Sequence, residues 1–252
     1  MSDFSEQLTR YERKGREHLS RVRLSHVLAL KTLQGVNSLL DEELKTDEEL
    51  QGLVSKSFGS TTANKTKMRG ILHDLHLVSL KANFELFLDR ILVTIWKFHF
   101  DQLAAFIPPA VSLRAEKRYP HDDCNRRDFI IENEEVVPPH GLQLLEALTK
   151  VTNIHCKEVL SKSYWPQIFT AFQVRHLVEH CDGKVDKTFR MKVDKFWRDS
   201  SWGRRQSQSL SELKKVVTEK EDVDETYAAM WESTELLSKE VLKWSSDHEN
   251  LR

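Results

Sequence analysis

The fold class follows from residues 71–96, which read ILHDLHLVSLKANFELFLDRILVTIW. On a helix with about 3.6 residues per turn, the apolar residues of this stretch fall on nearly every side. A helix that is apolar almost all round is normally buried among other elements. The stretch therefore predicts the central helix of a helical protein, extending over about residues 66–106 until Pro108 and Pro109 stop it.

The segments on either side of this helix repeat the helical period. Residues 4–40 carry leucines and valines at helical spacing among charges, and they predict one long helix. The capping-box pattern at residues 46–49 predicts a short helix that continues through Val54. The same period predicts four later helices, at residues 142–160, 166–181, 189–197 and 222–244.

Two segments lack this period. Residues 110–141 contain three of the six prolines and predict irregular structure, with a short strand at residues 129–131. Residues 199–209 predict a polar loop. Gly183 lies where the helix that ends near residue 181 would stop, because glycine commonly terminates helices.

The composition agrees with an all-α fold. The chain of 252 residues has only eight glycines and six prolines, too few for the many turns of an all-β protein. Apolar residues make up 39% of the chain and charged residues 31%, which suits a buried core beneath a solvated surface.

The sequence predicts a cytoplasmic protein that does not enter the membrane. Its N-terminus has no apolar signal core, and no run approaches the ~20 apolar residues of a membrane span. The three cysteines form no CxxC pair, and their odd number favours reduced thiols over a disulfide framework.

The candidate chemistry lies in Arg175, His176 and His180. Histidines four residues apart lie about 40° apart around a helix axis, so both rings face one way. Arg175 starts about 100° from His176, and its long side chain can reach the same place. A guanidinium binds phosphate oxygens in pairs, and imidazoles transfer protons near neutral pH, so this set predicts phosphate chemistry.

A basic segment follows these residues. Residues 184–205 carry eight basic and three acidic residues, in a chain whose net charge is only −1. This local excess predicts a surface that can bind an RNA backbone, with Lys184, Lys187 and Arg190 as candidate contacts. The alternative is a solvated face without a ligand.

Residues 175–180, RHLVEH, resemble the signature of the HEPN family: an Arg, a polar residue, three variable residues and a His. Residues 183–189 resemble the segment that often follows this signature. Residues 77–90 resemble an upstream core helix that carries an acidic residue in an apolar setting, and residues 216–227 resemble the closing element of the stand-alone RiboL-PSP-type branch. The resemblance covers about residues 66–245. It departs from the commonest form at His176, where Asn is usual.

The resemblance implies an antiparallel helical bundle at residues 61–248, preceded by a helical arm at residues 1–60. It also implies a homodimer in which two motif helices meet, so that two Arg/His sets line one cleft. Active members cleave RNA without a metal or cofactor, because the ribose 2′-hydroxyl attacks the neighbouring phosphate. Arg175 would stabilise the developing charge, and His180 would transfer protons with His176 supplementing it. Many members are toxins or defence effectors, so an antitoxin or regulatory protein is an expected partner.

Other interpretations stay open. The chain could be a catalytically silent HEPN module that binds RNA, a nucleotide or a protein, or a helical interaction protein that uses the N-terminal helix as a coiled arm. Glu85 could support a motif side chain, or it could pair with Arg90 or Lys81.

Several residues have both a site interpretation and a packing interpretation. His73 with His76, and His155 with Cys156, are short ligand-like pairs, but no further clustered ligands complete a tetrahedral set, so no metal site is expected. Three tryptophans could stack bases or pack in the core, namely Trp165, Trp197 and Trp202.

Overall fold

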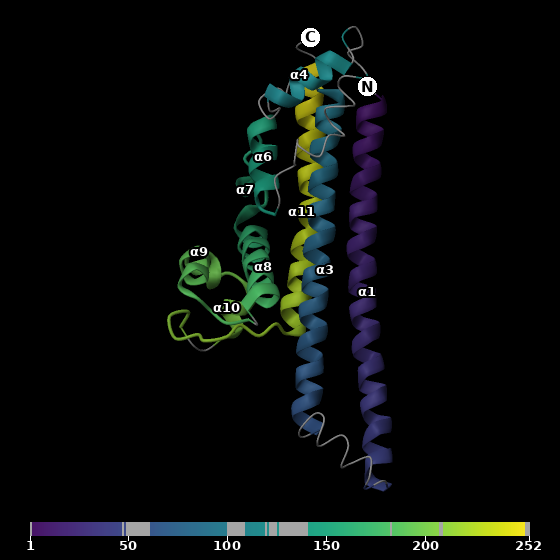
Figure 1. Cartoon of the computed structure of the whole chain (residues 1–252), viewed down its shortest axis with the longest axis vertical. Helices are drawn as coiled ribbons and strands as arrows, with labels where there is room; N and C mark the ends of the chain where they lie inside the picture. Colours follow the sequence, from purple (N-terminus) through teal and green to yellow (C-terminus); the bar gives the residue numbers. More distant parts are fainter. Residues whose placement is uncertain are drawn as a thin grey trace. The chain divides into compact units, whose positions relative to one another are not determined.

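The fold is all-α, as predicted. A computed structural model describes residues 2–46, 48, 61–99, 109–118, 120, 125, 141–181, 183–206 and 209–249. Within these ranges the regular structure is helical, and the only strand-like pairing is one isolated bridge between Lys184 and Lys215. Figure 1 shows the long helices and the shorter ones that follow α3. None of the helices in the described part of the chain combines the length and the apolar character of a membrane span.

The helices have the following bounds: α1 Ser2–Thr46, α3 Thr61–Phe98, α4 Pro109–Arg118, α6 Gln143–Thr152, α7 Cys156–Val159, α8 Ser161–Cys181, α9 Lys187–Trp197, α10 Ser201–Arg205 and α11 Lys220–Glu249. The predicted long N-terminal, central and C-terminal helices are confirmed, and α1 and α11 extend beyond their predicted ends. The predicted strand at 129–131 and nearly all of the short helix predicted from residue 46 lie outside the described residues, as does the central helix beyond residue 99.

Four details of the prediction are wrong. Residues 110–118 are helical, because Pro109 starts α4 at the one helical position where its missing N–H costs nothing. The predicted polar loop contains α10, which Ser200 caps by accepting a hydrogen bond from the Gly203 N–H. Asn153 adopts a left-handed conformation with φ 58° and divides the predicted helix at 142–160. Helix α8 begins before Pro166, and it includes that residue.

By their internal contacts, the residues form two units. Unit 1 comprises residues Met1–Glu17, Ala82–Trp165 and Trp231–Arg252, and unit 2 comprises His18–Lys81 and Pro166–Met230. Each of α1, α3, α8 and α11 therefore contributes to both units. The predicted domain boundary at residue 60 stays a prediction.

Unit 1 is held by apolar and aromatic contacts between its chain segments. The Phe4 ring makes edge contacts with Phe98 and His99, at centroid distances of 5.6 and 5.3 Å. The His99 Nε2 atom lies 3.1 Å from the Ser245 Oγ atom, which links α11 to the end of α3. Gly15 allows close packing, because a Cβ atom there would lie 3.0 Å from the Phe87 ring. Unit 1 thus joins α1, α3 and α11.

The core of unit 2 is built around the second half of α8. Its buried residues Ala171, Val174 and Leu177 belong to one apolar cluster. The cluster also contains residues from α3, α9, α10 and the segment before α11, namely Leu77, Phe189, Val193, Trp197, Trp202, Leu213 and Val216. Because these contacts take one face of α8, the opposite face is left for the motif side chains.

A buried polar network fixes α8 to α10 and α11 within unit 2. The Gln167 side chain donates to Ser201 Oγ and Thr226 Oγ1, each at 3.0 Å, and its carbonyl accepts from the Ser201 N–H at 2.8 Å. Asp222 is fully buried and accepts from Ser201 Oγ at 2.6 Å and from Arg205 at 2.5 Å. Burial raises the pKa of Asp222 despite these hydrogen bonds. The network pairs buried groups that would otherwise oppose folding.

Asp186 is the N-cap of α9. Its backbone is extended, and its carboxylate accepts a hydrogen bond from the Phe189 N–H at 2.6 Å. We expect Asp186→Ala to lower the free energy of unfolding by about 1 kcal/mol, because an unpaired helix N–H remains. A chain of this size should then melt about 2–4 °C lower, as followed by circular dichroism. Asp186→Ser should retain most of the stability. Asp194→Ala, which removes an exposed carboxylate from the same helix, should melt like the unsubstituted protein.

Candidate functional site

The structure places Arg175, His176 and His180 together on the exposed side of α8. The His176 and His180 rings lie 4.8 Å apart between centroids and are tilted by 57°. The His180 side chain is 59% exposed and that of Arg175 26%. This arrangement confirms the predicted geometry of the two histidines, since buried Val174 and Leu177 turn the motif residues outward.

Glu179 is the residue that sequence reasoning missed. Its carboxylate forms an ion pair with the Arg175 guanidinium one turn earlier and lies 3.8 Å from His180 Nε2. The Arg175 Nε–H is buried without a hydrogen-bond partner, so the guanidinium is only partly satisfied. The i, i+4 spacing of Arg175 and Glu179 was a visible signal for this pair. The site is therefore an Arg–Glu–His group rather than an Arg–His pair.

We expect Glu179→Gln to strengthen binding of single-stranded RNA severalfold. A bound phosphate would compete with this carboxylate for Arg175, and removing the carboxylate charge would reduce repulsion of an RNA backbone. Stability should fall by about 0.5 kcal/mol, as is typical for an ion pair one helical turn apart. Fluorescence anisotropy with a labelled RNA in a His180→Ala background measures the affinity without cleavage.

The matched control for this experiment is Glu235→Gln. Glu235 forms ion pairs with Lys239, one turn later on α11, and with Arg16 of α1, and all three residues lie in unit 1. The same gain in affinity in both variants would show that overall charge, and not competition at Arg175, is responsible.

The end of α8 is fixed by backbone contacts. Gly183 adopts a left-handed φ of 71°, and its N–H donates to the Leu177 carbonyl at 3.0 Å. The next residues pair with the segment before α11: the Val185 N–H donates to the Lys214 carbonyl and the Val216 N–H donates to the Gly183 carbonyl. A Cβ atom on Gly183 would also lie 3.0 Å from the Val216 carbonyl oxygen. Gly183 therefore ends the helix as predicted, and it orients the chain just after His180.

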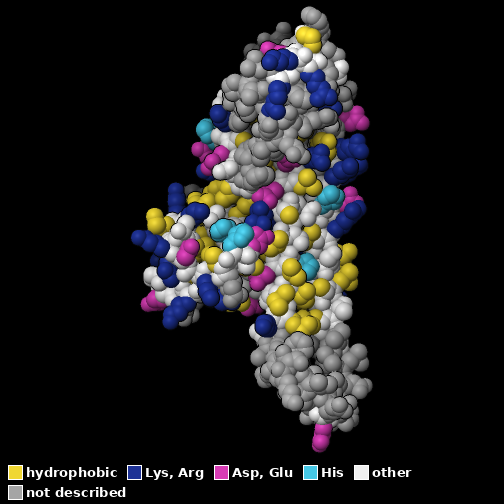
Figure 2. Space-filling model, in the orientation of Figure 1, with side chains coloured by type: hydrophobic (Ala, Val, Ile, Leu, Met, Phe, Trp, Pro, Cys, Tyr) yellow, Lys and Arg dark blue, Asp and Glu magenta, His cyan; other side chains and the backbone are white. Residues whose placement is uncertain are grey.

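The three side chains predicted to contact RNA differ in exposure and in their hydrogen bonds within the chain. Lys184 and Lys187 are exposed, and Lys184 lies opposite Lys215 in the isolated bridge. Arg190 instead donates to the Leu210 and Leu213 carbonyls at 3.2 and 2.9 Å, so it holds the following loop. Figure 2 shows Lys and Arg side chains gathered over α9 and α10. Two like charges placed opposite one another repel, and a bound polyanion would relieve this repulsion.

Glu85 lies in unit 1, whereas the motif residues lie in unit 2. Its supporting role stays a prediction. The tryptophans are packed: Trp165, Trp197 and Trp202 are 6%, 4% and 0% exposed. None of them offers an open face on which a base could stack.

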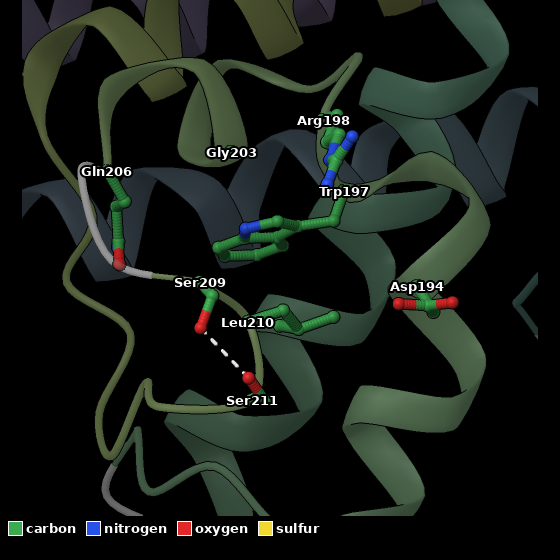
Figure 3. A pocket seen from close by; sticks show the side chains of 8 residues that line it. All are labelled: Asp194, Trp197, Arg198, Gly203, Gln206, Ser209, Leu210 and Ser211. Atoms are coloured by element: carbon green, nitrogen blue, oxygen red, sulfur yellow. Dashed lines mark hydrogen bonds between the residues drawn. The ribbon is translucent and has the colours of Figure 1, made fainter.

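A cavity of about 440 Å³ lies between α9, α10 and the segment that follows α10. Figure 3 shows the Trp197 indole and Leu210 beside the polar groups of Asp194, Gln206, Ser209 and Ser211. The hydroxyls of Ser209 and Ser211 are 2.8 Å apart. Because the Trp197 ring is almost fully covered, the cavity offers hydrogen-bonding groups without a stacking platform.

A cluster of three histidines also lies in unit 2. It consists of His73 and His76 on α3 and His26 on α1. His26 Nε2 lies 2.8 Å from His73 Nδ1, and the His26 and His76 rings are 4.5 Å apart between centroids. His26 and His73 are 0% and 3% exposed. Burial, followed by the proximity of His76 and His73, lowers the pKa of His26 to about 4, and burial also lowers the pKa of His73.

These histidines are not arranged as a metal site. In the described part of the chain, no group of three or more His, Cys, Asp or Glu side chains is placed to hold a metal ion. His26 and His73 form a hydrogen bond directly to each other, and His76 Nδ1 lies 2.6 Å from the Leu72 carbonyl oxygen, to which it donates.

The exposed Arg–Glu–His group can bind a phosphate and transfer protons, since it combines a guanidinium with two accessible imidazoles. In comparisons with known proteins, no family model matches the chain, and no curated protein or solved structure shows significant similarity to it.

Proposed function

We propose that the chain is a metal-independent endoribonuclease of HEPN type, acting in the cytoplasm as a toxin or defence effector. The observation that carries this proposal is the grouping of Arg175, His176 and His180 on one exposed face of α8, with the two imidazoles 4.8 Å apart. The exposed Lys184 and Lys187 extend this face toward a polyanion.

The chemistry assigns one role to each side chain. The ribose 2′-hydroxyl loses its proton and attacks the adjacent phosphorus, and the bond to the 5′-oxygen of the next nucleotide breaks. His180 is the general acid or base, and His176, whose ring is adjacent, supplements it. Arg175 binds the non-bridging oxygens, where negative charge develops. The products are a 2′,3′-cyclic phosphate and a 5′-hydroxyl.

A second candidate function is a catalytically silent module that binds RNA, a nucleotide or a protein. The Arg175–Glu179 ion pair favours it, because a guanidinium already neutralised by a carboxylate is less available to a scissile phosphate. The two functions differ in whether RNA is cut after it binds.

Cleavage of RNA in the presence of EDTA tests the proposal. We expect the purified protein to cut single-stranded RNA in EDTA, because imidazoles can supply the proton transfers. A DNA of the same sequence should remain intact, because it lacks the 2′-hydroxyl nucleophile. Gel electrophoresis and mass spectrometry of the fragments should find the cyclic phosphate or its hydrolysis product.

The controls separate the proposed enzyme from a contaminant and from the silent module. An RNA with a single 2′-deoxy nucleotide at the cleavage position should resist cutting there alone. Binding without cleavage would support the silent module. Cleavage that requires Mg²⁺ would contradict the mechanism.

The resemblance also leads us to propose that two subunits pair through their motif helices, and that an antitoxin or regulatory protein controls them. A homodimer would supply two Arg–Glu–His groups to one cleft, which is useful because one group offers few side chains for holding and cutting a phosphodiester. Co-purification of the chain with the product of a neighbouring gene tests the regulatory partner.

A further inference from the structure

Two lysines that are distant in the sequence lie side by side just after the end of α8. Lys184 and Lys215 are directly opposite each other in the isolated antiparallel bridge of unit 2. Backbone hydrogen bonds of 3.0 and 2.9 Å flank them on either side, so they form a non-hydrogen-bonded pair, in which opposite side chains lie closest. Side chains that are directly opposite in an antiparallel pairing leave the same face. We call these two residues the lysine pair.

The position of the lysine pair is fixed by the backbone and the core rather than by the lysine side chains. The Lys184 N–H donates to the Cys181 carbonyl at 2.9 Å, and Val216, next to Lys215, is buried in the apolar cluster of unit 2. Both lysines are exposed. Like charges directly opposite each other destabilise a strand pairing. The fold therefore holds two ammonium groups together against their repulsion, and an anion that contacts both would remove that repulsion.

The lysine pair lies at the end of α8 that carries His180. The hydrogen bond from Lys184 to Cys181 closes a turn that starts one residue after His180, and the Cα atoms at the two ends of such a turn lie less than about 7 Å apart. The Lys215 side chain lies over Gly183, since a Cβ atom added to that glycine would be 3.2 Å from the Lys215 Cε atom. An anion held by both ammonium groups therefore lies beside the last turn of α8.

An RNA that reaches His180 needs positive charge at this point. The C-terminal end of a helix carries a partial negative charge, which repels phosphates. The charge of Arg175 is only partly available, because its guanidinium is already paired with Glu179. The lysine pair supplies two further ammonium groups, and lysine binds a phosphate as a point charge. A backbone phosphate carries several oxygens in one group, so it can contact both lysines.

We propose that Lys184 and Lys215 together bind one phosphate of the RNA backbone, adjacent to the phosphate that Arg175 binds, and so position the scissile bond against His180. This inference rests on the proposed ribonuclease function, and it adds Lys215, which lies outside the basic segment 184–205. Both lysines are positioning residues, because neither contacts the reacting atoms.

Fluorescence anisotropy with a labelled single-stranded RNA, in the His180→Ala background that keeps the RNA intact, tests the lysine pair. Lys184→Gln and Lys215→Gln should each weaken binding about fivefold at 0.1 M salt, because each lost phosphate contact reduces the salt slope by about 0.7 on a single strand. The double variant should show the same reduced slope as either single variant, because one shared phosphate is lost in all three. Single-stranded DNA should show the same changes, since it carries the same phosphates.

Lys214→Gln is the matched control. It removes the same charge from an exposed residue next to Lys215, but successive residues of an extended segment point to opposite sides. Its effect on affinity should therefore be smaller than that of Lys215→Gln, and the salt slope should stay unchanged. Lys215→Arg keeps the charge and should retain most of the affinity.

Thermal melting separates phosphate binding from a structural role at the end of α8. Lys215→Gln should melt at the same temperature as the unsubstituted chain or slightly higher, because it removes one of two like charges. A lower melting temperature with unchanged affinity for RNA would show that Lys215 only stabilises the negative end of the helix, and would overturn the proposal.

Single-turnover cleavage in EDTA, with His180 present, distinguishes failure of this inference from failure of the proposed function. We expect Lys215→Gln to lower the rate severalfold even when all of the RNA is bound, because the scissile bond is less well positioned. Cleavage with unchanged rate and affinity in both lysine variants would overturn the lysine pair and leave the ribonuclease unaffected.

Two other results would also contradict the proposal. Lysine-dependent binding without any cleavage by the unsubstituted chain would overturn the ribonuclease and the positioning role, and would leave a phosphate-binding pair. A double variant whose salt slope falls by the sum of the two single changes would assign Lys184 and Lys215 to separate phosphates.

Discussion

The His180→Ala protein is expected to cleave RNA about 10²–10⁴-fold more slowly than the unsubstituted chain. That range is the usual contribution of a general acid or base, and the alanine side chain cannot transfer a proton. The loss should appear in the single-turnover rate rather than in RNA affinity, because in the proposed mechanism His180 acts on the reacting atoms, and the variant keeps Lys184 and Lys187. A 5′-labelled RNA, cleaved with excess protein in EDTA, measures both quantities.

The fold should tolerate this substitution, since the His180 side chain is 59% exposed. The matched control is His155→Ala, which removes another exposed histidine from outside the site. Arg175→Lys should also reduce the rate, because an ammonium cannot make paired contacts to a phosphate. A His180→Ala protein that cleaves at the original rate would remove the proposed mechanism and leave the helical fold unaffected.

Lowering the pH is expected to destabilise the chain through His26, by as much as about 3 kcal/mol in the free energy of unfolding. The pKa of His26 is about 4 in the folded chain and about 6.5 when unfolded. The unfolded chain therefore takes up the proton first as pH falls. The stability that this histidine preserves is fully present above about pH 6.5 and is lost as the pH falls toward 4.

The surroundings of His26 explain why its pKa is lowered. Burial has the largest effect, and His76, His73 and Lys220 also oppose a positive charge, whereas Asp224 favours it. Around His73, Glu219 and Glu221 favour the charge and Arg69 opposes it. Asp224 is held 3.3 Å from Arg23, which reduces its effect on His26. Once both rings are protonated, two N–H groups would face each other across the 2.8 Å contact between His26 and His73.

Urea unfolding between pH 7.5 and 4.5 measures this dependence. Because carboxylates titrate in the same range, the relevant quantity is the difference between the unsubstituted chain and His26→Phe. At pH 7.5 the variant should be less stable than the unsubstituted chain. It should then lose less stability as the pH falls to 4.5. His155→Gln, which changes an exposed histidine, should follow the unsubstituted chain. Equal slopes for all three proteins would show that His26 does not control the acid sensitivity.

Features that depend on the local helical period are predicted well from the sequence. The long helices α1, α3 and α11 each span enough turns to show a clear apolar repeat. The four-residue spacing of His176 and His180 predicts by itself that both rings lie on the same side of α8. The helix end at Gly183 was also predicted, because glycine commonly terminates helices. The N-cap at Asp186 was not predicted, and α9 begins two residues before the expected residue 189.

What the sequence does not predict depends on neighbours that are distant along the chain or on competing signals. His26 joins His73 across 47 residues, and no local pattern marks that contact. Helix α10 is a single short turn whose glycine and serines also suit a loop, so its cap is clear only once Ser200 is placed. Glu179 was visible at i+4 from Arg175, but the spacing does not reveal that its carboxylate also approaches His180.

The interleaving of the two units has a consequence for how the chain is made on the ribosome. Unit 1 needs residues from the first turns of α1, and it also needs Trp231 and the rest of α11. A nascent chain that lacks residues 231–252 cannot complete unit 1, although Phe4 and Leu8 have long since left the exit tunnel. The early helices must therefore remain without their final partners until α11 has been synthesised, and folding of unit 1 is expected to follow the emergence of α11 rather than that of α1 or α3.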